Sequence, residues 1–283
     1  MSAGESGASA ESEKAEDWVV PSALDRLGDA IRGRHLWHPS ANRSLVLLTT
    51  EIERLEGLHS RKESSVTLKE RAALAEQIAK VQCELAFTAE RQTAEFGAEV
   101  ERLTKQGRRD RAVWKRYDET RSLWIGAWKG AAESFRRLMA EYASFCDAGR
   151  DCMDEWRYSE AVATERSGDV ARAIAGYRAV LAQPKSIFAA EARFALADID
   201  SRLALTDESR RKSATEALRG VIAEATGDRA AYSNVRLAKL LQQEKDEVGA
   251  KAASAAAKQA CVDAPLRSIC HELVALIDRA PGR

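Results

Sequence analysis

The side chains that most often perform catalysis or bind metals are sparse in this chain and poorly spaced for either task. His35 and His38 form an H-x-x-H pair, but no third ligand lies near them and Pro39 follows directly, which favours a turn. Cys270 precedes His271, yet adjacent residues on a helix point about 100° apart and do not face each other. We find no glycine-rich phosphate loop, nucleophile elbow or H-E-x-x-H motif. The sequence therefore predicts no enzyme, no metal site and no cofactor.

Five cysteines raise a separate question, which is whether the chain forms disulfides. Cys146 and Cys152 flank a short polar stretch, and Cys261 and Cys270 flank a stretch with a central proline. Both stretches are typical of turns between helices, where two cysteines can come within bonding distance, and such bonds persist only in oxidising compartments. The alternative is that the cysteines are reduced and buried as small apolar side chains. If both bonds form, Cys83 stays free and we expect an export signal upstream of the first residue.

The composition of the chain is typical of globular proteins, and its charge balance argues against a protein that wraps nucleic acid. The chain is 45% hydrophobic and 31% charged, and its 44 basic residues balance 44 acidic ones. Proteins that wrap nucleic acid usually carry a basic excess, so no strong nucleic-acid signal is present. No apolar stretch is long enough for a transmembrane segment, and the start of the chain lacks the pattern of a signal peptide. We therefore expect a cytoplasmic protein, with a periplasmic or exported one as the alternative if the cysteines are bonded.

One local charge imbalance stands apart from this balance. Residues 102–116 hold seven basic side chains and one acid, Asp110. Such a segment could contact nucleic acid, anionic lipid or an acidic protein segment, including the chain's own acidic start. A solvated helix end and turn explains the same residues. The sequence leaves open whether the segment binds anything.

Hydrophobic periodicity predicts an all-α protein in three parts. Residues 1–17 form a disordered acidic tail, residues 18–150 an N-terminal helical bundle with long antiparallel helices, and residues 151–283 a domain of repeated helix pairs. At the start of the bundle, the segment from Pro21 to Gly33 has apolar residues at helical spacing and suits a short helix.

The rest of the bundle is predicted to be a coiled-coil-like hairpin with an added helix. Apolar residues follow heptad spacing from about residue 42 to 58 and again from 66 to 106, with a polar loop between them. The second helix would be about 60 Å long, so it must pack on something else at its far end. An aromatic seam from Trp114 to Phe145 supplies that partner. The alternative is an exposed aromatic stripe that docks a partner or a second copy of the chain.

The connection between the bundle and the repeats is short. Only the turn from Cys146 to Cys152 separates the aromatic helix from the next one. Flexible interdomain linkers are usually longer and richer in glycine or proline. We therefore expect the aromatic helix to pack directly on the first repeat as its cap, with Trp156 buried at the junction.

From residue 154 onward the sequence begins to repeat. The first unit has small residues at Ala161 and Ala173 around a Gly168-Asp169 turn, and further units start at Ala190 and Ala231, spacings of 36 and 41 residues. This pattern resembles the tetratricopeptide-repeat (TPR) family, whose units are about 34 residues long, over about 125 residues of the chain. The resemblance implies about three TPR-like helix pairs followed by a capping helix at residues 267–278. The junction at residues 183–192 also resembles repeats of bacterial envelope assembly proteins.

The same resemblance implies where a partner would bind. Members of this family line their concave face with the first helix of each pair. The matching positions in this chain are Tyr158, Val162, Glu165, Glu191, Phe194, Asp198, Tyr232, Val235 and Lys239. Their mixture of aromatic, apolar and charged groups suits a peptide or helix of another protein.

We therefore expect a non-enzymatic protein–protein interaction scaffold or adaptor. The alternative is a structural component of a bacterial envelope-type assembly. In that case the N-terminal helices would act as a stalk that forms a homo-oligomer.

Overall fold

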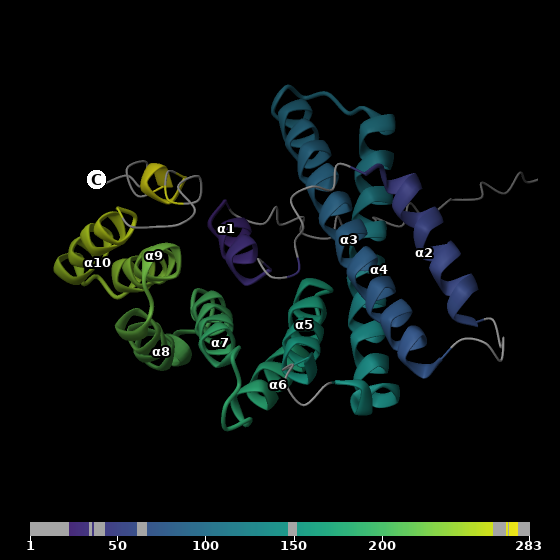
Figure 1. Ribbon diagram of the computed structural model, residues 1–283. Helices are drawn as coiled ribbons and strands as arrows, with labels where there is room; N and C mark the ends of the chain where they lie inside the picture. The colour runs from purple at the N-terminus through teal and green to yellow at the C-terminus, as the bar shows by residue number, and fades with distance from the viewer. Residues whose placement is uncertain are drawn as a thin grey trace, which may run out of the picture.

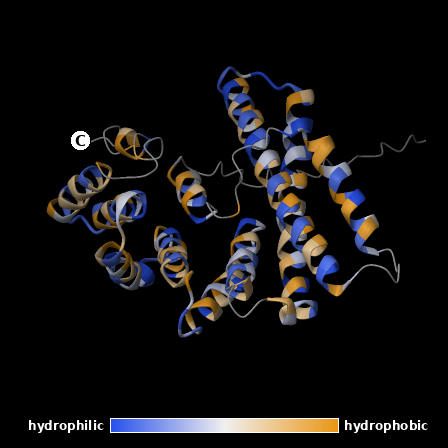
Figure 2. Ribbon diagram, viewed as in Figure 1, coloured by the Kyte–Doolittle hydropathy of each residue, from blue (hydrophilic) through white to orange (hydrophobic). Residues whose placement is uncertain are grey.

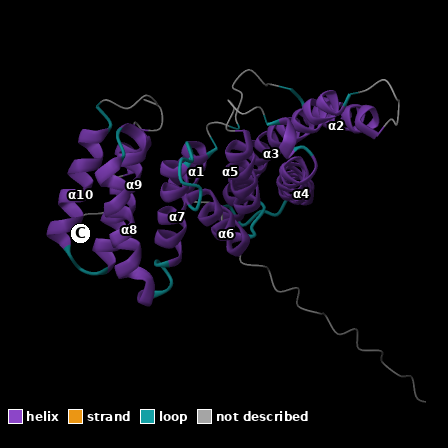
Figure 3. Cartoon of the chain, turned by 60° about the horizontal axis from the view of Figure 1, so that its bottom comes forward, coloured by secondary structure: helices purple, strands orange, loops and turns teal. Residues whose placement is uncertain are grey.

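The chain folds as a set of helices packed side by side, with no strand among the residues described (Figures 1 and 3). The computed structural model describes residues 23–33, 36, 43–60, 67–146, 152–262, 270 and 272–276. The expected acidic tail at residues 1–17 lies outside these ranges, as do His35, His38, His271 and most of the expected capping helix. The all-α prediction is confirmed for the described residues.

Three helices form the N-terminal bundle: α2 (Leu45–Ser60), α3 (Leu68–Lys105) and α4 (Arg111–Glu141). The helices α3 and α4 pair as a long antiparallel hairpin, and α2 packs on α3. Thr67 and Glu70 form a capping box that starts α3, since each side chain accepts a hydrogen bond from the backbone of the other. A long hairpin is therefore present, but its two main helices are α3 and α4. The heptad spacing instead predicts a hairpin of residues 42–58, which include most of α2, with residues 66–106.

The aromatic seam of α4 lies in the core of this bundle. Trp128, Phe135 and Tyr142 are buried, and Trp128 meets Phe87 of α3 edge to face at 4.9 Å. Figure 2 shows apolar residues on parts of the circumference of both long helices, with polar ones on the rest. Each buried aromatic side chain contributes roughly 2–3 kcal/mol. The seam thus holds α4 against α3 rather than forming an exposed stripe.

The bundle packs directly on the helices that follow it, through α4 and α5. A short helix η1 (Ala143–Phe145) ends α4, and a disulfide links Cys146 to Cys152 at a Cα–Cα distance of 5.6 Å. Trp156 is buried in the same core as the aromatic side chains of α4. Direct packing of the aromatic helix on the next pair, expected from the short connection, is confirmed.

Three helix pairs follow. They are α5 (Cys152–Arg166) with α6 (Val170–Leu181), α7 (Ala189–Leu203) with α8 (Arg211–Glu224), and α9 (Gly227–Gln243) with α10 (Glu247–Ala260), and a short helix η2 (Glu208–Arg210) precedes α8. Each helix packs on the next along the chain, so the pairs stack in order. The third pair begins one turn earlier than the predicted start at Ala231, since α9 starts at Gly227, whose φ is 60°. Asp228 supplies an acid to its first turn, where it interacts favourably with the helix dipole.

Two of the pairs turn in the same way. Gly168 and Lys245 each adopt a left-handed φ, of 95° and 62°. The next residue, Asp169 or Asp246, accepts a hydrogen bond from the backbone N–H three positions on, at 3.1 and 2.8 Å. The third pair is tied at its end by a disulfide between Cys261 and Cys270, whose Cα atoms lie 5.3 Å apart.

Candidate helix-binding groove

The first helix among the described residues packs on helices that lie far from it in the sequence. Helix α1 (Ala23–Arg32) packs against α7 and α9, and the backbone carbonyl of Arg32 accepts a hydrogen bond from Tyr158 Oη of α5 at 3.4 Å. Figure 1 shows α1 on the side of the repeat formed by the first helix of each pair. We call this surface, from Glu165 of α5 through Phe194 and Asp198 of α7 to Arg236 of α9, the groove.

An apolar face of α1 fills the groove. Leu24, Leu27 and Ile31 are buried, and they share one hydrophobic core with Phe194 and Tyr232. Their spacing of three and four residues puts them on one side of the helix. Burial of such side chains stabilises the docked helix by about 1.5–3 kcal/mol each.

Gly28 lets α1 approach α9 closely. A Cβ atom at this position would overlap the phenol oxygen of Tyr232. The glycine therefore fits here because it lacks a side chain, although a glycine within a helix costs about 0.5–1 kcal/mol relative to alanine. Close packing against Tyr232 offsets that cost.

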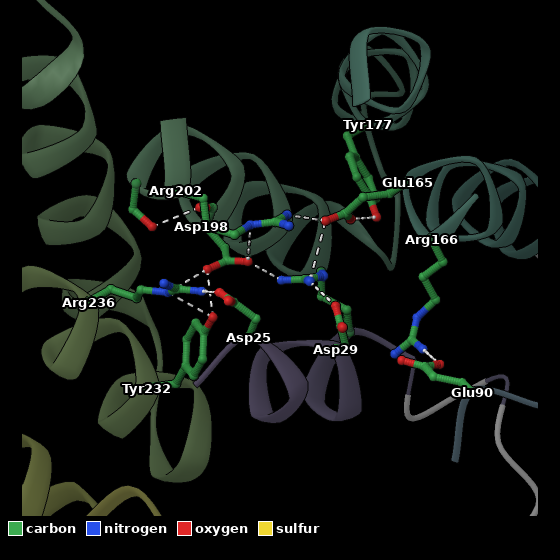
Figure 4. A network of polar contacts seen from close by, with 12 residues as sticks. Asp25, Asp29, Glu90, Glu165, Arg166, Tyr177, Asp198, Arg202, Tyr232 and Arg236 are labelled. Carbon is green, nitrogen blue, oxygen red and sulfur yellow. Dashed lines mark hydrogen bonds and ion pairs between the residues drawn. The ribbon is translucent and has the colours of Figure 1, made fainter. Parts of the chain in front are cut away.

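A buried charge network joins α1 to all three first helices (Figure 4). The guanidinium group of Arg32 pairs with Asp198 of α7, with Glu165 of α5 at 3.3 Å, and with Asp29 one turn earlier on its own helix. At the other end of α1, Asp25 pairs with Arg236 of α9. Because two nitrogens of Arg32 reach separate carboxylates, a lysine could not make the same contacts.

Asp198 is the centre of this network. It accepts a hydrogen bond from Tyr232 Oη at 2.7 Å, and it pairs with Arg236 at 3.0 Å, with Arg202 at 3.3 Å and with Arg32. Burial alone would raise the pKa of Asp198, but the three guanidinium groups hold it well below its usual range. The carboxylate is therefore charged at any physiological pH.

Glu165 is the second acid of the network. It accepts a hydrogen bond from Tyr177 Oη at 2.7 Å and pairs with Arg202 as well as Arg32. Burial lowers the pKa of Arg32, yet Glu165, Asp198 and Asp29 together raise it above its usual value. Both acids thus stabilise the cation that α1 brings into the groove.

The nine residues predicted to line a partner-binding face all lie on α5, α7 and α9, but most are covered in this structure. Glu191 is partly exposed, where it pairs with Arg229 at 3.0 Å, and Lys239 is exposed. The other seven are buried: Tyr158, Val162, Glu165, Phe194, Asp198, Tyr232 and Val235. Tyr158 and Val162 belong to the core between α5, α6 and α7, whereas the others surround α1 or its charge network.

Sequence reasoning missed the occupant of the groove. The helix around Leu24, Leu27 and Ile31 was expected, but its place was not. Arg32, Arg202 and Arg236 also went unassigned. The signal that could have found them is the need of a buried acid such as Asp198 for cationic partners.

Two other features of the structure give less indication of function than the groove does. A hollow of about 460 Å³ between α2, α3 and α4 contains His59, whose Nε2 lies 3.0 Å from Tyr142 Oη. Burial, and secondly the charge of Arg137, lower the pKa of His59, so its imidazole is neutral near pH 7. An imidazole beside a phenol does not select a class of ligand.

The basic segment at residues 102–116 lies at the tip of the α3–α4 hairpin. Arg102 pairs with Glu99 at 2.5 Å and Lys105 with Glu101 at 2.6 Å, so part of its charge is neutralised within the chain. Asp110 caps α4 there by accepting hydrogen bonds from the backbone of the first turn.

The described residues contain neither a metal-ligand cluster nor a membrane-spanning helix. No cluster of three or more potential metal ligands occurs among the described residues. Within the same residues, no helix is both long and apolar enough to cross a membrane. No protein-family model, curated protein or solved structure matches this chain.

Proposed function

We propose that this chain is a non-enzymatic protein-interaction scaffold whose groove binds an amphipathic helix. The observation that carries the proposal is α1, which occupies the groove with matched apolar and charged contacts. A surface that receives one helix in this way has the shape and charge to receive another. The buried acids of the groove, Glu165 and Asp198, favour a bound helix that carries a cation, as Arg32 of α1 does.

The stacked pairs support a TPR-like architecture for the scaffold. Small residues occur where two helices of a pair cross, since a Cβ atom at Gly176 of α6 would lie only 2.9 Å from the Cβ of Ala161 of α5. The first helices of the three pairs all contribute to the groove, as the resemblance implies. The scaffold and adaptor class follows from that architecture together with the occupied groove.

The two disulfides favour the exported alternative over a cytoplasmic location. Bonds such as Cys146–Cys152 and Cys261–Cys270 persist in oxidising compartments and are rare where thiols are kept reduced. The protein partners would then belong to the same compartment.

A structural, self-associating role is the second candidate. Val46 and Leu47 of α2 are 74% and 60% exposed at the edge of the bundle, where a second copy could cover them. Light scattering over a range of concentrations separates the two roles, because a concentration-independent monomer argues against a stalk that oligomerises.

Affinity capture followed by competition tests the scaffold role. Proteins from the native source are captured on an immobilised full chain that carries Leu27→Asp, so that its own α1 does not fill the groove, and are then washed with millimolar peptide of residues 22–33, which contains the wild-type α1. Partners held in the groove should elute with this peptide and stay bound with a control peptide that carries Leu27→Asp. If both peptides elute the same proteins, or neither elutes any, the groove does not hold the partners.

A further inference from the structure

The groove keeps its internal charge balance without α1. If Arg32 leaves, Asp198 still pairs with Arg202 and Arg236, and it still accepts the hydrogen bond of Tyr232. Glu165 likewise keeps Arg202 and the hydroxyl of Tyr177. Departure of α1 therefore leaves no buried acid of the groove without a partner, although it uncovers the apolar side chains of Phe194 and Tyr232.

Helix α1 itself depends on the groove. It has ten residues, and isolated helices shorter than about 12–15 residues are marginal in water. Its apolar side chains Leu24, Leu27 and Ile31 are covered only when it is docked. The docked helix is thus a ligand tethered to its own receptor.

The contacts of α1 define what the groove recognises. Apolar side chains fill the positions of Leu24, Leu27 and Ile31, and a small residue is needed at Gly28 beneath Tyr232. An acid at the position of Asp25 pairs with Arg236. An arginine at the position of Arg32 reaches both acids of the groove. The recognised pattern is therefore apolar-acid-x-apolar-small-x-x-apolar-Arg, read along one helix.

Lys239 offers a contact that α1 does not fully use. It is exposed on α9 one turn beyond Arg236, the residue that pairs with Asp25 near the start of α1. A helix that extends one turn before the position of Leu24 and carries an acid there would pair with this cation. Such a helix gains a contact that the tethered helix lacks.

Resting on the proposed function, we propose that the groove binds a helix of a partner protein that carries this nine-residue pattern, extended by an N-terminal acidic turn, and that this helix displaces α1. The partner is another protein rather than a second copy. A tethered helix has an effective concentration of roughly millimolar, so an identical helix from a second copy cannot displace it at ordinary concentrations. Only a helix with additional contacts, such as one to Lys239, overcomes that advantage.

The test measures binding of labelled peptides to the full chain by fluorescence anisotropy. One probe is the peptide of residues 22–33, and the second is the same peptide preceded by a helical turn with glutamates. The hosts are the wild type and a Leu27→Asp chain whose own α1 is released, with Arg32→Ala as a second released host. Far-UV circular dichroism checks that each host keeps its helices.

The released hosts should bind the short peptide about tenfold or more tightly than the wild type, since the competing helix no longer fills the groove. The extended peptide should bind the wild type more tightly than the short one, and Lys239→Glu in the host should remove that gain. An Arg32→Glu peptide should lose about tenfold or more in affinity for the released hosts.

Equal affinity of parent and Arg32→Glu peptides, or no gain in the released hosts, would overturn the inference. A wild-type chain that dimerises by exchanging α1 would assign the groove to a second copy and would overturn it too. The capture experiment tests the scaffold role separately from these peptide measurements. Partners that elute with the α1 peptide but lack the pattern overturn the inference and leave the scaffold role intact. The absence of any captured partner overturns the scaffold role and, with it, the assignment of the pattern to a partner protein.

Discussion

Arg32 of α1 and Asp198 of α7 are 166 residues apart in the chain and form an ion pair in which both side chains are inaccessible to solvent. Such a pair links the start of the chain to the middle of the repeat. Because neither group could be buried alone without a large desolvation penalty, each depends on the other partners in the network.

Replacement of the two members of this pair should have unequal effects. Arg32→Ala leaves Asp198 with Arg202 and Arg236, whereas Asp198→Ala leaves three arginines without their shared acid. We expect Asp198→Ala to lower the free energy of unfolding by about 3–5 kcal/mol and Arg32→Ala by less. Urea denaturation measures both.

The matched control for these variants is Arg102→Ala. Arg102 pairs with Glu99 on the exposed face of α3, where an ion pair contributes only about 0–1 kcal/mol. If Asp198→Ala costs no more than this surface change, the network does not hold α1 in the groove.

Asp198 makes the stability of the folded chain depend on pH. Its folded-state pKa is depressed below the unfolded value of 3.8, so its contribution is fully present above that value and is lost as pH falls below it towards the folded-state pKa. The wild type should therefore lose stability more steeply below pH 3.8 than an Asp198→Asn chain does. Parallel acid titrations followed by circular dichroism would give coincident slopes if Asp198 were not charged and paired.

The turns of the repeat make a prediction about backbone strain. Lys245 adopts a φ of 62°, which costs a residue with a Cβ roughly 1 kcal/mol and costs glycine almost nothing. Lys245→Gly should raise the free energy of unfolding by up to about 1 kcal/mol, while Gly168→Ala at a φ of 95° should lower it by a similar amount. Thermal melts of the two variants should shift in opposite directions, and a shared direction contradicts the argument.

The order of helices could be predicted from sequence because it depends on local signals. Heptad spacing, the aromatic seam and the Gly168-Asp169 turn each involve residues close together in the chain, and the helices they predict are present. The position of α1 could not be predicted in that way. Its contacts depend on Asp198 and Glu165, which are over a hundred residues away, and periodicity carries no information about such distant pairs.

The candidate site also could be predicted only in part from the sequence. The resemblance assigned the nine residues to the first helix of each pair, and these residues lie on α5, α7 and α9, but it implied an open face where most of them are covered. A pattern of small and apolar residues specifies how pairs stack, and Tyr158 and Val162 lie in that stacking core. Whether the remaining face is empty depends on charges such as Arg32, which the pattern does not include.

Thiol counting tests the two disulfides and the compartment that they favour. Protein from its native source, denatured without reduction, should show one free thiol, that of Cys83. In the folded protein this thiol should react slowly, because burial raises its pKa to about 12 and excludes the reagent. Five reactive thiols after denaturation would instead indicate a reducing compartment.

The repeat helices should depend on the N-terminal part of the chain for their solubility. Trp156 and Ala163 of α5 are buried against α4, and α1 covers the groove, so a fragment of residues 151–283 would expose both apolar surfaces. This fragment should aggregate when expressed alone. Co-expression with residues 1–150 should restore a soluble complex, because that piece supplies α4 and α1 together.

The control for this experiment uses the same cut in the intact protein. A protease site placed after Arg150 lies between the bonded Cys146 and Cys152, so the cleaved halves stay linked until the disulfide is reduced. If packing rather than the covalent bond holds the halves, they should co-elute even after reduction. A fragment of residues 151–283 that is soluble, monomeric and melts cooperatively by itself would show that bundle and repeats are independent, and the groove would then need no helix from the N-terminal part.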